Sequence, residues 1–331
     1  MLGRLAIAAG VHGALLVLGA AEFRLLKRLL FEESREYDFV LDNMRGILDG
    51  TPAYVAWQHR LVGPACWWVL ELVTQNALVA LEVLTALLLF AANALVFELA
   101  QRDGADRRRA LVIAAALGFA RLLLTYRLEY PWDGIDVLLF LLFGWLVARQ
   151  NTSRWSLPIC IVGAVNHETA LYVPIWYAIC ACDPRRARAE RGRALKLSLV
   201  AATGMLVTIF ALRHALYVGK PSWGTDAHDA APLIGNPLHV AHNLRQLFIR
   251  NWLTDKLAVS LAFIGTVALL TRALADARWR CAAIWTLLVL ASVVCFGFVN
   301  ETRLYLAPLA FWFGYCTKSF VPSAPRTVGP A

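Results

Sequence analysis

Long apolar runs separated by short polar or basic stretches are the dominant pattern along the chain. A transmembrane helix needs about 20 consecutive, mostly apolar residues, and most of the runs are close to that length. The runs that we expect to cross a bilayer are 5–23, 76–99, 110–125, 134–148, 195–217, 257–273, 281–299 and 304–320. The pattern therefore predicts an all-α, polytopic integral membrane protein.

The apolar stretch 61–99 is too long for one crossing and barely long enough for two. Its first part, 62–75, contains Gly63-Pro64 and Trp67-Trp68, and tryptophan favours the headgroup level of a bilayer. We therefore expect 62–75 to form an interfacial or re-entrant helix in the first outer loop, followed by a crossing at 76–99.

The stretch 156–182 reads as one long crossing, but basic residues lie at both of its ends. Arg149 and Arg154 precede it, and five arginines follow it between 185 and 193. A single crossing would place one of these basic groups outside, against the positive-inside rule. We therefore expect a hairpin of two short helices that turns at Asn166-His-Glu-Thr169. Such short helices are acceptable at membrane depth where they line a cavity.

With this hairpin the chain makes about ten crossings, and both termini lie in the cytoplasm. Residues 1–331 then form a single transmembrane domain with large outer loops at 24–75 and 218–252 and no separate soluble domain. The basic residues collect in the short inner loops. The net charge of +9 therefore indicates how the chain is oriented in the membrane, and it implies no nucleic-acid partner.

The composition excludes two common classes of protein. Hydrophobic residues make up 59% of the chain and charged residues only 17%, with a mean hydropathy of +0.57, whereas soluble domains average roughly 45–50% apolar and 25% charged residues. The seven cysteines mostly lie within or at the ends of apolar runs, and no C-x-x-C motif occurs. The chain is therefore neither an ordinary soluble enzyme nor a secreted disulfide scaffold.

Under this topology, the residues that offer the most chemistry face the outer side. They are Tyr37, Asp38, Asp42 and Asp49 in the first loop, Arg127, Glu129, Asp133 and Asp136 in the second, His167 and Glu168 at the hairpin turn, and Glu301 and Arg303 before the last crossing. Asp38 also fits a charged stretch that is merely solvated, and Asp133 is as well placed to cap the following helix. Ionisable groups at or below the membrane interface tend to form ion pairs or to take part in function. This favours a functional role for His167 and Glu168 and for Glu301 and Arg303.

Two of these positions share a local sequence. Asn166-His-Glu-Thr-Ala-Leu-Tyr172 and Asn300-Glu-Thr-Arg-Leu-Tyr305 both contain Glu-Thr-x-Leu-Tyr, and each is soon followed by a proline, Pro174 or Pro308. One shared short sequence in leucine-rich helices does not establish an internal repeat. It does place two helix N-termini, with their free backbone N–H groups, at the same outer cavity, which suits an anionic group.

The second large outer loop offers a spacing that suits a divalent metal. His239 and His242 are three residues apart, and Asp226, His228 and Asp229 lie upstream. An amphipathic helix with histidines facing headgroups explains the pair more simply, so we assign no metal ligands. No P-loop, G-x-S-x-G, H-E-x-x-H or G-x-G-x-x-G motif occurs, which argues against an ATP-driven pump and the commoner soluble mechanisms.

Three features of the chain occur together in one known class of membrane enzymes. Asp38 precedes Gly50 and Tyr54 in the first outer loop, a short-helix hairpin lies between two basic clusters, and Glu301-Thr-Arg303 enters the last crossing. In this organisation the chain resembles the GT-C class of glycosyltransferases, polytopic enzymes that use polyprenyl-phosphate-linked sugars. Many members carry paired acids where Asp38 stands alone, and many have a soluble C-terminal domain that is not expected here.

The resemblance implies transfer of a sugar from a polyprenyl-phosphate carrier to a hydroxyl of a glycan or lipid acceptor. The active face would be the non-cytoplasmic face of a bacterial inner or plasma membrane. Asp38 would act as the general base, and Arg303 would stabilise the departing phosphate, with Arg127 and His167 as the next candidates. The remaining acids would bind sugar hydroxyls or a divalent cation: Glu129, Asp133, Glu168 and Glu301.

Two other functions stay open. A lipid-linked glycan polymerase or ligase would also use arginines and acids on the outer side. Its largest outer loop usually comes late in the chain, whereas loops 24–75 and 218–252 are comparable in size. A lipid or solute transporter, or flippase, would place polar residues along the middle of several crossings. Such residues are sparse here, with Glu82, Asn93 and Thr203 among the few, so we expect an enzyme.

Overall fold

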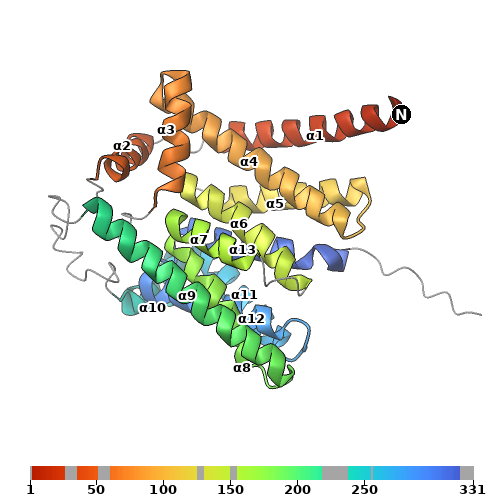
Figure 1. The fold of residues 1–331 in the computed structure, drawn as a ribbon, viewed down its shortest axis with the longest axis vertical. Helices are drawn as coiled ribbons and strands as arrows, with labels where there is room; N and C mark the ends of the chain where they lie inside the picture. Colours follow the sequence, from red (N-terminus) through yellow and green to blue (C-terminus); the bar gives the residue numbers. More distant parts are fainter. Residues whose placement is uncertain are drawn as a thin grey trace, which may run out of the picture.

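The computed structural model describes residues 2–26, 36–50, 60–124, 130–149, 155–217, 238–254 and 256–320. Within these ranges every regular element is helical and no β-strand occurs, which confirms the all-α prediction. The α-helices are α1 (Leu2–Leu26), α2 (Glu36–Asp49), α3 (Val62–Thr74), α4 (Ala77–Arg102), α5 (Arg107–Leu124), α6 (Pro131–Ala148), α7 (Ser156–Asn166), α8 (Tyr172–Cys182), α9 (Arg188–Tyr217), α10 (Val240–Phe248), α11 (Leu257–Ala273), α12 (Arg280–Phe296) and α13 (Leu306–Cys316). In Figure 1, α1, α4 and α5 lie on one side of α6 and α13, and α8, α9 and α12 lie on the other.

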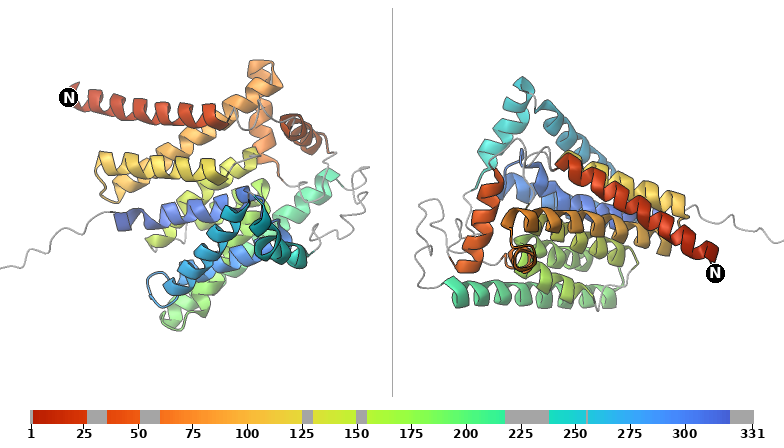
Figure 2. Two further views of the ribbon diagram at one scale, coloured as in Figure 1. Left: turned by 180° about the vertical axis from the view of Figure 1, so that it is seen from behind. Right: turned by 90° about the horizontal axis from the view of Figure 1, so that it is seen from above.

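Three of the described helices are long and apolar enough to cross a membrane by length and composition: α4, α6 and α9. The apolar helices α3, α7, α8, α11 and α12 are shorter. The share of the most apolar 18 residues that is buried inside the protein is 72% in α6, 50% in α4 and 17% in α9. α6 is therefore the central helix, while α9 lies at the edge of the bundle, as the two views in Figure 2 show.

The apolar stretch 61–99 forms two helices, as its length and composition predicted. α3 ends at Gln75, whose backbone is left-handed with a φ of 52°. Asn76 then caps α4, because its side-chain oxygen accepts the N–H groups of Leu78 and Val79 at 3.0 and 3.1 Å. Figure 1 shows α3 running crosswise to α1 at one end of the bundle.

The chain turns back on itself at His167. The Cys160 sulfur of α7 lies 3.9 Å from the Ala170 carbonyl oxygen, whereas ten residues of a continuous helix would separate the two by about 15 Å. After the extended His167, a short 3-10 helix, Glu168–Leu171, leads into α8. The structure therefore confirms the predicted hairpin of two short helices and the position of its turn.

α6 and α13 approach each other more closely than side chains at their contact would allow. A Cβ on Gly144 of α6 would lie 2.1 Å from the carbonyl oxygen of Phe311, and a Cβ on Gly314 of α13 would lie 2.0 Å from that of Leu141. Small residues at a helix interface permit this backbone contact. The two helices run parallel, because Asp133 near the start of α6 lies beside Arg303 just before α13, while Arg149 and Thr317 at their other ends share Asp103.

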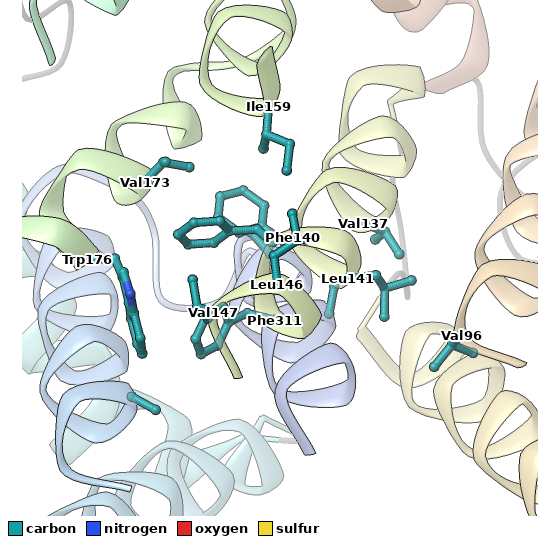
Figure 3. Close-up of a cluster of buried hydrophobic side chains, with 14 of the residues drawn as sticks. Val96, Val137, Phe140, Leu141, Leu146, Val147, Ile159, Val173, Trp176 and Phe311 are labelled. Carbon is teal, nitrogen blue, oxygen red and sulfur yellow. The ribbon is translucent and has the colours of Figure 1, made fainter. Parts of the chain in front are cut away.

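Aromatic side chains fill the space around this helix pair (Figure 3). The ring of Phe311 lies 4.2 Å from that of Trp285, 5.3 Å from that of Trp176 and 6.0 Å from that of Phe143, measured between ring centroids. All four side chains are buried. They join α6 and α13 to α8 and α12, so one core connects the two halves of the chain.

The C-terminal ends of α4, α6 and α13 are joined by polar side chains. Arg149 forms an ion pair with Asp103, and its guanidinium lies 3.8 Å from the centre of the Trp145 ring. The hydroxyl of Thr317 donates to the same Asp103 carboxylate. A buried acid thus connects three helix ends, at the end of α6 opposite to the candidate site.

Gly144→Ala should destabilise the protein, because the new Cβ has no room beside the Phe311 carbonyl. Overpacking typically costs roughly 1–3 kcal/mol, so we expect a lower Tm for the purified protein in detergent. Gly204→Ala in α9 is the matched control, because no atom lies within 4 Å of its added Cβ. Equal Tm values for the two variants would contradict the close α6–α13 contact.

Candidate functional site

The site begins at the N-terminal end of α6, where Asp133 and Asp136 lie about one turn apart. Pro131 occupies the first helical position, which its fixed φ favours, so the helix begins before Asp133. The Asp133 carboxylate accepts the backbone N–H of Tyr130 at 3.2 Å. The interpretation of Asp133 as the N-cap is therefore wrong: it is the third residue of the helix and binds back to its start.

Asp133 also binds Arg303, which the 3-10 helix Thr302–Tyr305 presents just before α13. Arg303 Nη1 lies 3.2 Å from Asp133 Oδ2, and Nη2 lies 3.5 Å from Glu301 Oε2. Burial by itself lowers the pKa of Arg303, but the Asp133 and Glu301 carboxylates outweigh it and raise the pKa. Arg303 therefore stays charged, although its side chain is only 13% exposed.

A second arginine, Arg60, forms a similar arrangement beside the hairpin turn. Its Nε donates to Glu168 at 3.0 Å, and a second N–H group pairs with the same carboxylate. Next to it, the Leu61 N–H donates to the Val165 carbonyl at 2.8 Å, which connects the start of α3 to the end of α7. The Arg60 side chain is 6% exposed and that of Glu168 is 44% exposed, so the carboxylate faces the surface.

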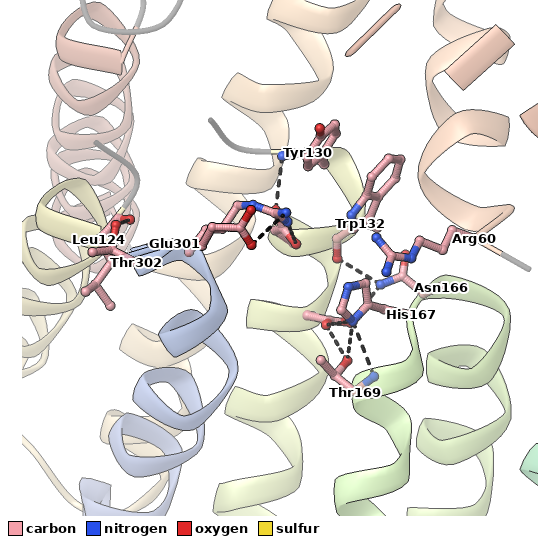
Figure 4. A network of polar contacts seen from close by, with 12 residues as sticks. Arg60, Leu124, Tyr130, Trp132, Asn166, His167, Thr169, Glu301 and Thr302 are labelled. Carbon is pink, nitrogen blue, oxygen red and sulfur yellow. Dashed lines mark hydrogen bonds and ion pairs between the residues drawn. The ribbon is translucent and has the colours of Figure 1, made fainter. Parts of the chain in front are cut away.

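Tyr130 and Trp132 join the two arginines into one cluster (Figure 4). The two rings are stacked, with centroids 4.3 Å apart and planes 9° apart. The Arg60 guanidinium lies 5.3 Å from the Trp132 ring centre, and that of Arg303 lies 4.8 Å from the Tyr130 ring centre. Cation–π contacts strengthen when they are desolvated. Burial also raises the pKa of the Tyr130 hydroxyl, so this side chain stays protonated.

Asp136, about one turn further along α6, binds the hairpin turn. Its Oδ1 accepts the side-chain amide of Asn166 at 2.8 Å, its Oδ2 accepts the hydroxyl of Thr169, and His167 Nδ1 lies 3.4 Å from Oδ2. The Asn166 amide also donates to the Trp132 carbonyl at 2.8 Å. Asp136, Asn166 and His167 are all buried, so solvent does not compete for these bonds.

The two echoed sequences adopt the same local structure. Glu168–Leu171 is a 3-10 helix that enters α8, and Thr302–Tyr305 is a 3-10 helix that enters α13. An aspartate of α6 binds each one: Asp136 binds the first turn and Asp133 binds the second. The α6 helix therefore brings both turns to one end of the bundle.

The cluster thus combines charged arginines with two acids that water can reach. The carboxylates of Glu168 and Glu301 are 44% and 42% exposed, and each pairs with one of the arginines. A guanidinium is well suited to bind phosphate oxygens in pairs.

The predicted site residues divide into three groups. Asp133, His167, Glu168, Glu301 and Arg303 gather at this end of the bundle, as expected. Arg127 and Glu129 lie outside the described residues, as does Tyr54 of the first-loop resemblance. Asp38 forms the third group and is treated next.

Asp38 takes no part in the arginine and aromatic cluster. It is exposed on the first turn of α2 and makes no hydrogen bond or ion pair with the residues that the structure describes. The opposite face of α2 is apolar, and its Val40 and Met44 pack in the same buried cluster as Tyr130 and Trp132. The structure therefore brings the helix of Asp38 to the site and leaves its carboxylate in solvent.

Both histidines of the pair in the second large outer loop contact an aromatic ring. His239 and His242 lie 4.4 and 5.6 Å from the ring of Phe298, measured between centroids. Asp226, His228 and Asp229 lie outside the described residues. Within the described part of the chain, no three His, Cys, Asp or Glu side chains form a group that could hold a metal ion.

Several residues of the cluster were missed by reasoning from sequence. Arg60 ends a polar loop and directly precedes an apolar, tryptophan-containing helix, a position that could have indicated an interfacial arginine. Tyr130-Pro-Trp132 precedes Asp133 directly, and aromatic residues beside a buried acid could have indicated a cation–π partner. Asn166 and Thr169 were assigned only to the turn. Their common partner, Asp136, is 30 residues from Asn166 and 33 residues from Thr169 in the sequence.

No protein-family profile, no curated protein and no solved structure matches this chain. The function must therefore be argued from the geometry of the site and from the arrangement of the helices around it.

Arg303→Met should strongly destabilise the protein, because it leaves Asp133 buried without its cationic partner. Removing one member of a buried pair typically costs roughly 3–5 kcal/mol. The double variant Asp133→Asn/Arg303→Met should recover most of the lost Tm, since no buried charge is then left unpaired. Glu301→Gln is the control, because exposed pairs contribute about 1 kcal/mol or less. Additive losses in the double variant would contradict a direct Asp133–Arg303 pair.

Proposed function

We propose that this chain is a multi-pass membrane glycosyltransferase that moves a sugar from a polyprenyl-phosphate carrier to a hydroxyl of a glycan or lipid acceptor. The observation that carries the proposal is Arg303, a charged, largely buried guanidinium held by Asp133 and Glu301. Such a preorganised cation stabilises the charge that develops on a departing phosphate. The half-exposed Glu301 is the part of this arrangement that a substrate would displace.

The proposed topology has ten crossings and an active face on the non-cytoplasmic side of a bacterial inner or plasma membrane. It takes α1, α4–α9 and α11–α13 as crossings, and α2, α3 and α10 as interfacial helices. Support comes from the three long apolar helices and from the hairpin. In this topology α7 and α8 are two short helices that each cross the membrane. The basic residues that follow α8 and the candidate site then lie on opposite sides.

The proposed reaction is a single displacement at the anomeric carbon of the sugar. The acceptor oxygen forms a bond to this carbon while the bond from the carbon to the phosphate oxygen breaks. The phosphate leaves with the electron pair and is met by Arg303, with Arg60 as a second cation. The general base that accepts the proton of the acceptor hydroxyl is Asp38, which the acceptor meets on the solvent-exposed face of α2. Glu168 binds sugar hydroxyls, and so does Glu301 once the phosphate has replaced it at Arg303.

A second candidate function, lipid or solute transport, is favoured by a polar group inside the bundle. The Asn93 amide donates to Glu22 at 2.9 Å, and Arg121 of the adjacent α5 is also buried. Ionisable residues within membrane helices often mark transport paths. The sugar-transfer assay separates the two functions, because a transporter has no transferase activity to lose. No observation favours a lipid-linked glycan polymerase or ligase over sugar transfer.

Asp38→Asn should abolish sugar transfer while the protein stays folded. General-base catalysis contributes typically 10²–10⁴-fold, so turnover of a polyprenyl-phosphate sugar should fall by about that factor. Asp42→Asn is the matched control, because Asp42 is also exposed and lies one turn later on the same helix. Tm values of both variants should equal that of the wild type. Unchanged turnover in Asp38→Asn would remove Asp38 from the reaction.

Cysteine labelling tests the proposed topology. In a chain without its seven native cysteines, Glu168→Cys should react with a membrane-impermeant maleimide from outside, because this side chain is half exposed at the hairpin turn. Arg188→Cys should react only after the membrane is permeabilised, since it follows α8 on the inner side. Labelling of both positions from the same side would contradict the hairpin crossing.

A further inference from the structure

A short amphipathic helix, α10, and the 3-10 helix Arg250–Leu253 that follows it expose an apolar and basic surface. We refer to it as the α10 surface; its residues are Leu244, Arg245, Phe248, Ile249, Arg250, Trp252 and Leu253, all exposed. The exposed fractions of Phe248 and Leu253 are 58% and 82%. Apolar side chains that lie together in one exposed patch mark a surface that contacts a partner or a membrane.

The charge of this segment has one sign. Residues 238–254 contain two arginines and no carboxylate, and both arginines lie among the exposed apolar side chains. Trp252 belongs to the same surface, and its indole N–H donates to the Leu247 carbonyl at 2.8 Å. Apolar side chains, tryptophan and cations on one exposed face are the combination with which interfacial helices bind anionic lipid surfaces.

The buried face of α10 is tied to the loop that precedes Arg303. The Asn243 amide donates to the carbonyls of Val294 and Gly297 at 2.8 and 2.7 Å, and its oxygen accepts the N–H of Val299 at 3.2 Å. These carbonyls belong to the last turn of α12 and the residue after it, where a helix has no partners of its own. Asn243 therefore joins α10 to the chain that leads to Glu301 and Arg303.

A second bond joins the end of this segment to the same loop. The Asn251 amide donates to the side-chain oxygen of Asn300 at 3.0 Å and to the hydroxyl of Ser260 at 3.0 Å. Asn243 and Asn251 are almost fully buried. The right-hand view of Figure 2 shows this segment, in teal, at the same end of the bundle as α2.

We propose that the α10 surface binds the headgroups of anionic phospholipids, and that Asn243 is a positioning residue that transmits this binding to the loop 297–303. The inference rests on the membrane location in the proposed function, but it does not depend on sugar transfer. Lipid contact orders α10, and the Asn243 bonds then order the turn that presents Arg303 to Asp133.

Hydrogen exchange measured by mass spectrometry tests the proposal on the full chain in vesicles. We expect exchange in 240–253 and 297–303 to be about 30-fold slower in vesicles that contain phosphatidylglycerol than in pure phosphatidylcholine vesicles, as attraction from two arginines would produce. Arg245→Gln/Arg250→Gln should lose this difference. Arg188→Gln/Arg193→Gln, which removes two exposed arginines from α9, should retain it.

Three results would overturn the lipid assignment. They are equal exchange of 240–253 in the two kinds of vesicle, undiminished protection in Arg245→Gln/Arg250→Gln, and the same protection produced by inorganic phosphate in phosphatidylcholine vesicles. Because the measurement needs no sugar donor, its outcome is independent of the transferase assay.

Asn243→Ala tests the transmission step. Protection of 240–253 by phosphatidylglycerol should remain, while protection of 297–303 should disappear, a pattern that a general loss of stability would not produce. Retained protection of 297–303 would overturn the role of Asn243. If this variant does not fold, Asn243→Ser, which keeps a donor, serves in its place with the same expected pattern in weaker form.

Discussion

The close contact between α6 and α13 is the constraint on which the rest of the structure depends. Gly144 and Gly314 let the two backbones touch, and this contact fixes the distance between the two parallel helices and their register. The chain before α13 must therefore meet the start of α6, where Arg303 finds Asp133. Larger residues at either glycine would separate the helices and move the guanidinium away from its carboxylate.

The first two turns of α6 organise the site because they carry two buried acids, Asp133 and Asp136, about one turn apart along the helix. Asp133 binds Arg303 and Asp136 binds the hairpin turn, so segments from two distant parts of the chain are held by one helix. Burial makes these acids dependent on their partners, since an unpaired charge in this environment is costly. The stacked rings of Tyr130 and Trp132 then bring Arg60 and Arg303 into the same cluster.

Local features of the chain could be predicted where a short sequence carries its own signal. The break between α3 and α4 follows from Gln75-Asn76, and the hairpin turn follows from four polar residues between two basic groups. The position of Asp133 was misjudged, because Pro131 moves the start of α6 toward Tyr130. Arg60 was missed because its partner, Glu168, is distant in sequence, and no local sequence pattern predicts an ion pair between distant residues.

The sequence by itself determined the helical class, the main helices, the turn at His167 and the gathering of acids and arginines near the ends of a few helices. These are consequences of hydrophobic periodicity and charge, which are local properties. Only the tertiary structure decided which charges pair, that Asp38 faces solvent, and that two aromatic rings lie between two guanidiniums. Those contacts depend on how closely helices pack, and that distance is set by a pair of glycines far from the residues that it brings together.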